Sequence, residues 1–179
     1  RMSWRQDRAM SGLNTLMMGI WYEALMRWVG EAKSLMASGR VYVAERPHAE
    51  SGQMCRVEIP KHLDIIADMR NGAQAHFQFS SVSGLDGVNR VALYGNRGTL
   101  VLEDGALFLG ATGDEALTAV DIPDEEAGAW RVEEEFVNAI RGLEAITHTT
   151  FEDGVRYMAF TEAVAESMQY GRRVDVWHA

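Results

Sequence analysis

Apolar positions near the start of the chain recur at helical spacing. After a polar, turn-prone stretch over residues 1–12, one stripe carries Asn14, Met17, Met18, Trp21, Leu25 and Trp28 at intervals of three and four. Gly30 follows closely and supplies a stop signal. The pattern predicts a helix over residues 14–28, in which Glu23 and Arg27 pair on the side away from the stripe.

The middle of the chain changes to a period of two. Residues 33–44 and 62–69 read as strands, and Asn71-Gly72 predicts a hairpin with a type I′ turn, whose two central residues need positive φ. Over residues 73–81 the alternation is clean. One face carries Ala73, Ala75, Phe77 and Phe79, and the other carries Gln74, His76, Gln78 and Ser80. Tight turns separate further short strands at 89–94, 99–103, 106–111 and 117–122, which indicates antiparallel pairing.

Helical spacing returns near the end of the chain, over residues 130–142. A second helix is predicted to begin at a capping box, formed by Thr149 with Glu152 or by Thr150 with Asp153, and to run to about residue 170. Gly171 ends it, and residues 173–177 read as a closing strand. The order predicts an α+β fold: an open, mainly antiparallel sheet with helices packed on one face, within a single domain over residues 1–179.

Composition excludes several classes of function. The chain has 179 residues, of which 47% are hydrophobic and 24% charged, and its net charge of −9 opposes binding to nucleic acid. No stretch approaches the roughly 20 apolar residues that cross a bilayer, so we expect no membrane partner. The single cysteine, Cys55, excludes an internal disulfide and suits a reducing, cytoplasmic location.

Several sequence motifs are missing. Gly84 and Gly87 lie in a hairpin loop, and Gly95 and Gly98 lie between two strands, so no Gly-rich strand–turn–helix is available for a dinucleotide, and we expect this chain alone to bind no cofactor. The five histidines have no metal-ligand spacing, and we expect no metal. Because the sequence opens at Arg1 without a signal-like segment, we expect either a chain cut from a longer protein or one whose beginning is missing.

An ordered set of segments resembles a known family. These segments are WRQDRAMSG with GIWYEALMRWVG, DMRNGAQAHFQFSS, GNRGTLVLEDG, WRVEEEFVNAIRG, and TTFEDGVRYMAFTEAVAESMQYGRRVDV. Together they resemble the C-terminal substrate and oligomerisation domain of the Gfo/Idh/MocA NAD(P)-dependent oxidoreductases, whose fold is similar to the C-terminal domain of glyceraldehyde-3-phosphate dehydrogenase. Each segment alone is weakly specific, and the order covers nearly the whole chain.

The resemblance implies an enzyme of two halves. An N-terminal Rossmann domain, absent from this chain, would hold NAD or NADP and supply a lysine from a Glu-Lys-Pro motif. The domain formed by residues 1–179 would line the cleft for a sugar, polyol or related hydroxyl compound. Its sheet face, with the Gln74, His76, Gln78 and Ser80 row, would be either a homo-oligomer interface or a solvated surface.

The chain departs from the family at the positions where a proton would be handled. The family motif D-x-G-x-H, aligned on Gly19, places Met17 and Trp21 at the acid and histidine positions, and Ala24 at a further acid. An indole only donates a hydrogen bond and a thioether is a feeble acceptor, so neither Met17 nor Trp21 can shuttle a proton. The resemblance therefore leaves open a second class of function, a non-catalytic binding or oligomerisation module.

Six residues remain as candidates for the site. Met17 and Trp21 either pack in the core or line the cleft, with Trp21 stacking on a sugar-like ring. Asn14 either binds substrate or caps the helix, and Arg5 either clamps a substrate or is a solvated surface residue. Tyr22 and Glu23 are weak candidates for proton transfer, which could instead fall entirely to the lysine of the missing half.

Overall fold

A computed structural model describes residues 1–85, 87–147 and 149–178. Two compact units are present: a larger unit of residues 1–82 and 135–179, and a smaller unit of residues 83–134. Each has its own antiparallel sheet, and the α+β class is confirmed. That residues 1–179 act as one domain stays a prediction.

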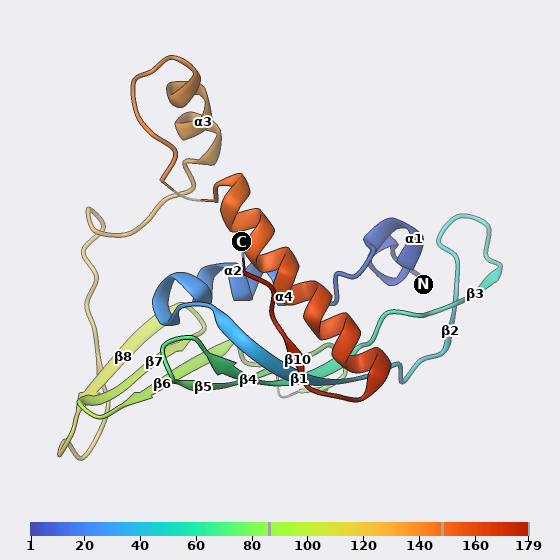
Figure 1. The fold of residues 1–179 in the computed structure, drawn as a ribbon, viewed down its shortest axis with the longest axis horizontal. Coiled ribbons are helices and arrows are strands. Elements are labelled where there is room, and N and C mark those ends of the chain that lie inside the picture. The colour runs from blue at the N-terminus through green and yellow to red at the C-terminus, as the bar shows by residue number, and fades with distance from the viewer. Residues whose placement is uncertain (86, 148, 179) are drawn as a thin grey trace. The chain divides into compact units, whose positions relative to one another are not determined.

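The larger unit carries most of the helices. Its helical elements are η1 (Trp4–Gln6), α1 (Arg8–Ser11), α2 (Met18–Val29) and α4 (Phe151–Tyr170), and its strands are β1 (Ala32–Arg40), β2 (Glu45–Pro47), β3 (Met54–Arg56), β4 (His62–Met69), β5 (Gln74–Ser80) and β10 (Val174–Asp175). Helix α3 (Val132–Ile140) runs across the boundary between the units. The main sheet has the order β10-β1-β4-β5, and β2 pairs with β3 in a separate hairpin (Figure 1).

Helices α2 and α4 pack on the same face of the main sheet. Tyr22 of α2 stacks on Phe160 of α4 with ring centroids 3.7 Å apart and planes at 5°. Both rings meet Phe77 of β5 edge-on, at 6.2 and 5.7 Å. Buried aliphatic side chains from β1 and β4 complete this core, among them Leu35 and Ile65. One face of the sheet is thus covered, as the alternation in β5 predicts.

Helix α2 differs from its prediction in both its start and its buried side. It begins at Met18 rather than at residue 14, after a left-handed Leu16 with φ of 54°. Its buried residues are Met18, Tyr22, Leu25 and Met26, so the predicted stripe was wrong by about a quarter turn. Apolar residues surround this helix on nearly every side, and periodicity alone therefore could not select the buried face.

The Asn71-Gly72 hairpin is confirmed, but its type I′ turn is wrong. Only Gly72 has positive φ, at 90°, and its N–H bonds to the carbonyl of Met69 at 3.0 Å. Asn71 has no positive φ, because the loop turns over residues 69–72 and only Gly72, which follows Asn71, is left-handed. The side-chain amide of Asn71 donates to the carbonyl of Val29 at the end of α2, at 2.9 Å, and its oxygen accepts from the N–H of Ala73 at 3.0 Å.

The C-terminal elements follow their predictions closely. Thr150 and Asp153 form the capping box of α4, and Gly171 ends the helix in the left-handed conformation. Ser167 then links α4 to the sheet, since its hydroxyl accepts from the N–H of Ala37 at 2.9 Å and donates to the carbonyl of Arg172 at 2.7 Å. Strand β10 is shorter than predicted, and the β2–β3 hairpin was not predicted.

The smaller unit is a meander of four strands. They are β6 (Arg90–Gly95), β7 (Gly98–Glu103), β8 (Ala106–Ala111) and β9 (Thr118–Ala119), paired antiparallel in chain order. Gly98 packs so closely on β8 that an added Cβ would lie 2.2 Å from the carbonyl oxygen of Gly110. Among the described residues, no helix has the length and apolarity needed to cross a bilayer.

Candidate functional site

The side of α2 that faces away from α4 forms an open, apolar surface. Successive residues of a helix turn by about 100°, and Tyr22 points into the core. Gly19 lies against the ring of Tyr157 in α4, so the opposite side of α2 is free of α4. We call this side the α2 outer flank; its residues are Met17, Trp21, Ala24 and Trp28.

The exposure of Met17, Trp21 and Asn14 decides some of the alternatives that the sequence left open for them. Met17 is 54% exposed, so the interpretation of Met17 as a core residue is wrong; Trp21 is half-buried. Asn14 is exposed and does not cap α2, whose N-cap is Met17 without a side-chain cap bond. Instead its side-chain oxygen faces Gly19, 3.8 Å from where a Cβ would stand. That Asn14, Met17 and Trp21 bind substrate stays a prediction.

Glu23 lies on the other side of α2, where it joins a polar cluster with α4. It forms the expected ion pair with Arg27. The hydroxyl of Thr149 donates to Glu23 at 3.1 Å and accepts from Arg27 at 3.0 Å. Thr149 has φ of 57°, which is unusual for a β-branched residue. The cluster holds the start of α4 against α2 and directs the Glu23 carboxylate away from the outer flank.

Tyr22 is a core residue. Its side chain is 1% exposed, and its hydroxyl accepts a hydrogen bond from the N–H of Ala32 at 2.9 Å. Burial raises the pKa of the Tyr22 phenol above its ordinary value of 10.0, and the bond from Ala32 opposes this only in part. The group therefore stays protonated at neutral pH and lies out of reach of any surface ligand.

We expect Tyr22→Phe to destabilise the protein by about 1–3 kcal/mol, because the buried N–H of Ala32 loses its acceptor. The folded state favours the neutral phenol, so the resulting stability is present below pH 10.0 and is lost as the pH rises through the higher folded pKa. Urea unfolding at pH 8 and pH 11 checks both effects. The variant should lose less stability between these pH values than the parent, whereas exposed Tyr170→Phe should follow the parent. Parallel curves for all three proteins would contradict the assignment.

Arg5 is exposed, and its guanidinium lies over the ring of Trp4 at 4.4 Å from the centroid. The chain beside it is tied to the β2–β3 hairpin by a bond from the N–H of Met2 to the carbonyl of Pro47 at 2.8 Å. The contact that the structure shows for the Arg5 guanidinium is the one with Trp4, and its substrate role stays a prediction.

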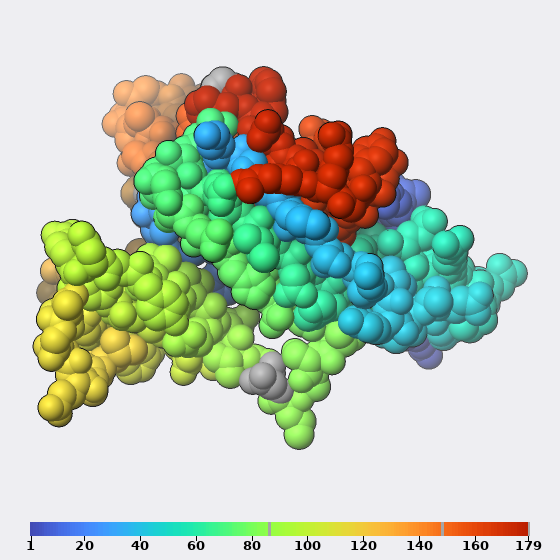
Figure 2. All heavy atoms as spheres, turned by 60° about the horizontal axis from the view of Figure 1, so that its bottom comes forward, coloured from blue at the N-terminus to red at the C-terminus, as the bar shows by residue number. Residues whose placement is uncertain are grey.

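The uncovered face of the main sheet is polar around a small apolar centre. Gln74, His76 and Gln78 are exposed there, as the alternation predicts, and Ser80 is half-buried. Asp64 lies among them, 3.1 Å from Gln78, 2.9 Å from His62 and 3.5 Å from His76. Burial alone would raise the pKa of Asp64, but the bonds from Gln78 and His62 hold it below its usual value. Figure 2 shows β1, β4 and β5, in blue to green, open at this surface.

Exposed Met36 and Ile66 form the apolar centre of this face. They lie opposite each other on β1 and β4, and Ile66 lies opposite His76 on β5. An apolar centre within a polar rim is typical of protein interfaces.

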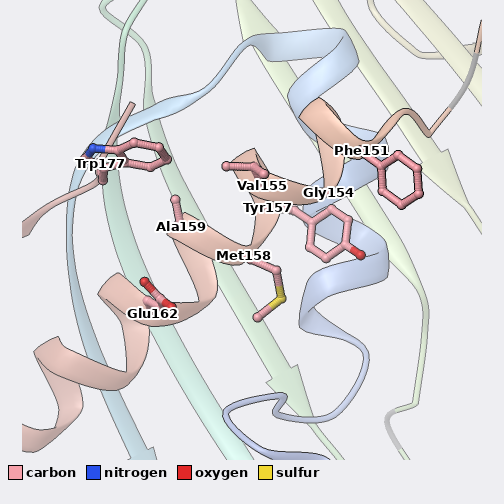
Figure 3. Close-up of a pocket in the computed structure, with 8 residues that line it drawn as sticks. All are labelled: Phe151, Gly154, Val155, Tyr157, Met158, Ala159, Glu162 and Trp177. Atoms are coloured by element: carbon pink, nitrogen blue, oxygen red, sulfur yellow. The ribbon is translucent and has the colours of Figure 1, made fainter. Parts of the chain in front are cut away.

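A groove that the sequence did not indicate runs along the first half of α4. It has a volume of about 480 Å³, and Phe151, Val155, Met158 and Trp177 provide its apolar lining (Figure 3). Glu162 stands at one end. The signal for it in the sequence is that Phe151, Val155 and Met158 place apolar side chains on the side of α4 where polar residues are expected.

The arrangement limits the chemistry that this chain can perform. The outer flank carries no side chain that accepts a proton near neutral pH, because its members are a thioether, two indoles and a methyl group. Among residues 1–85, 87–147 and 149–178, no group of three His, Cys, Asp or Glu side chains could hold a metal ion. The flank can stack on a ring and exclude water.

Comparison with known proteins gives a family and a fold. The family model described as the GFO/IDH/MocA C-terminal domain matches residues 1–101. A solved levoglucosan dehydrogenase, in complex with NADH and L-sorbose, matches 99% of this chain and 54% of its own, with 19% identity and a TM-score of 0.82. An NAD binding oxidoreductase from Klebsiella pneumoniae matches 99% of this chain and 55% of its own, with 16% identity and a TM-score of 0.79.

A more distant match is the WlbA dehydrogenase from Bordetella pertussis, in complex with NADH and UDP-GlcNAcA. It covers 91% of this chain and 44% of its own, with 16% identity and a TM-score of 0.64. None of the curated proteins compared with the sequence matches it. The chain thus spans about half the length of the solved structures that it resembles.

Proposed function

Since the chain belongs to the GFO/IDH/MocA family, through its C-terminal domain, we propose that it forms the substrate-cleft and oligomerisation domain of an NAD(P)-dependent oxidoreductase. The substrate is a sugar, a polyol or a related hydroxyl compound. The solved structures that share the fold are dehydrogenases and oxidoreductases of about twice this length, several of them with NADH bound. The proposed enzyme acts in the cytoplasm, and this chain acts there as a single domain.

One observation carries the assignment of the cleft: the α2 outer flank is open and apolar at the positions where the family places its acid and histidine. Trp21 and Met17 form a wall there, and the faces of an indole favour the apolar side of a sugar-like ring. Asn14 is retained as a candidate because its amide can bind a hydroxyl group, and its side-chain oxygen lies toward Gly19, on the α4 side of the helix start. Arg5 is retained as a further candidate for substrate binding.

NAD or NADP, held by an N-terminal Rossmann domain outside this chain, would accept a hydride from the carbinol carbon. The residues of this chain bind and orient the substrate, and they exclude water from the outer flank. They do not take the hydroxyl proton, because Tyr22 is buried and Glu23 points toward α4. That proton passes to the lysine of the missing half.

We expect Trp21→Ala in the full-length enzyme to raise KM at least tenfold, about 1.4 kcal/mol, with a smaller effect on kcat. The reason is that stacking contributes to substrate and transition state alike. Steady-state kinetics with a panel of sugars and polyols measures this. Exposed Trp130→Ala is the matched control and should leave KM unchanged. An unaltered KM for Trp21→Ala would remove the flank from the cleft.

Glu23→Gln separates the two routes for the proton. The variant keeps a side chain that can bond to Thr149, and turnover should be preserved if the lysine alone handles the proton. A loss of turnover together with a shifted pH profile would show that Glu23 takes part in proton transfer.

Calorimetry with NAD(H) and NADP(H) tests whether this chain alone binds the nucleotide. We expect no micromolar binding, because the chain offers no Gly-rich strand–turn–helix.

A second candidate function is a non-catalytic binding or oligomerisation module. The observation that favours it is the replacement of the family's acid and histidine by Met17 and Trp21, with Ala24 at the further acid. The upstream coding sequence distinguishes the two functions. A Gly-rich strand–helix turn followed by Glu-Lys-Pro supports the enzyme, and the absence of both supports the module.

Self-association through the uncovered face of the main sheet belongs to the proposal. Its support is the apolar centre of Met36 and Ile66 within a rim that includes Asp64, His76 and Gln78. Light scattering of the full-length protein should show an oligomer, which Ile66→Asp should dissociate. A monomer at high concentration would count against this interface.

A further inference from the structure

Two cations of the larger unit are half-buried. The chain has 17 Lys and Arg residues, and all of them are exposed except Arg46 on β2 and Lys61, which directly precedes β4. Burying a charge costs free energy unless a group of opposite charge lies beside it. Arg46 and Lys61 therefore need an anionic partner more than any other cation of this chain does.

No such partner is present in the part of the chain that the structure describes. Neither side chain takes part in an ion pair or a hydrogen bond there, and the Nε of Arg46 is buried without any acceptor. The acids nearest in sequence, Glu45 and Glu58, are exposed and leave both cations unpaired. Exposed Arg172 does have a carboxylate partner, although its charge is better solvated. The missing partner is thus specific to the two half-buried cations.

Arg46 and Lys61 are held close together by fixed backbone. The N–H of Lys61 donates to the carbonyl of Arg40 at 2.9 Å, and its carbonyl accepts from the N–H of Ser81 at 2.9 Å. Arg46 pairs with Cys55 across the β2–β3 hairpin (Figure 1). Burial lowers the pKa of the Lys61 ammonium, and the nearby positive charge of Arg46 lowers it further. An anion bound by both side chains would remove this repulsion.

We propose that Arg46 and Lys61 form a binding site for a phosphate group, carried either by free phosphate or by a phosphate ester. A guanidinium and an ammonium together balance a phosphate group, whose charge is about −1.5 to −2 near pH 7, whereas a carboxylate would balance only one of them. The guanidinium can bind two phosphate oxygens at once, and the ammonium adds a point charge. The terminal nitrogens of Arg46 stay open to a ligand, because the residue is only half-buried. The inference does not depend on the proposed function.

The labelling rate of Cys55 tests this site in the full-length protein without reference to activity. Cys55 lies opposite Arg46 on the hairpin, so both side chains are on the same side of it, and its thiol is free. Rates with iodoacetamide, followed by mass spectrometry of the Cys55 peptide, are compared in sodium phosphate and in sodium chloride of equal ionic strength. We expect saturating phosphate to slow the labelling roughly tenfold, because only the unoccupied site exposes the thiol.

Arg46→Gln and Lys61→Gln should each lose this protection, since each variant removes one of the two charges. Arg97→Gln is the matched control, because it removes an exposed cation from the turn between β6 and β7, and it should keep the protection. Thermal unfolding in chloride checks the fold: Arg46→Gln should melt no lower than the parent, because it loses an unpaired, half-buried charge. No slowing by phosphate in the parent, or equal slowing in Arg46→Gln, would overturn the proposal.

Three further ligands identify what the site binds. Protection by glucose 6-phosphate at a lower concentration than inorganic phosphate supports the proposal with a phosphate ester as the ligand, and the reverse order supports it with free phosphate. Acetate should protect far less than either, and equal protection by acetate would overturn the preference for a phosphate group. A hexaglutamate peptide that protects at a lower concentration than both phosphates would also overturn the proposal, because the site would then bind an acidic protein partner.

Discussion

Phe160→Ala is expected to lower the free energy of unfolding by about 3–5 kcal/mol, the largest effect among these variants. Phe160 is fully buried, and its ring lies between Tyr22 and Phe77. Truncation removes the ring contacts and leaves a cavity where α2, α4 and β5 meet, and none of these elements can move inward alone. Urea unfolding followed by circular dichroism measures the change.

Phe151→Ala is the control for this prediction, because it removes the same side chain from the same helix. Phe151 lies outside the core, so the 179-residue chain should change by no more than about 0.5 kcal/mol. Equal losses for Phe160→Ala and Phe151→Ala in the 179-residue chain would contradict the packing of α4.

Gly98→Ala is expected to destabilise the smaller unit by about 1–3 kcal/mol or more. The new Cβ would meet the carbonyl oxygen of Gly110 at 2.2 Å and the Cα of Ala111 at 3.0 Å. Both are backbone atoms of β8, so relief requires the two strands to separate. Hydrogen exchange of β7 and β8 amides reports directly on this sheet, and protection there should fall.

Gly128→Ala is the matched control in the same unit. Its added Cβ would meet no atom within 4 Å, and its φ is not positive. The exchange rates of β7 and β8 should therefore stay at the parent values. Unchanged protection in Gly98→Ala would mean that β7 and β8 do not approach as closely as described.

The sequence predicted most elements of the fold because their periods are clear. Residues 62–69 and 106–111 match β4 and β8 in full, and the capping box at Thr150 marks the start of α4. The β2–β3 hairpin was not predicted, because Glu45–Pro47 and Met54–Arg56 show no alternation of apolar residues. The turn type at Asn71 was assigned wrongly because Asn-Gly also fits a three-residue hairpin loop, in which only the glycine needs positive φ.

The candidate site was less accessible to sequence reasoning than the fold. The resemblance indicated positions 17 and 21, but their exposure depends on which side of α2 the core covers. Thr149 was considered only as a cap, because its contact with Glu23 spans 126 residues. The groove along the first half of α4 was missed, since a helix with large apolar residues on two sides reads as a single buried stripe.

Helix α2 is fastened by polar contacts that avoid its outer flank. Asn71 holds its last turn through the carbonyl of Val29, and Thr149 holds its middle through Glu23 and Arg27. Exchanging Met17 or Ala24 therefore leaves the anchoring of the helix intact. The side chains of the outer flank can therefore be substituted, for example by an acid at position 17 and a histidine at position 21, without loss of the polar contacts that hold α2 in place.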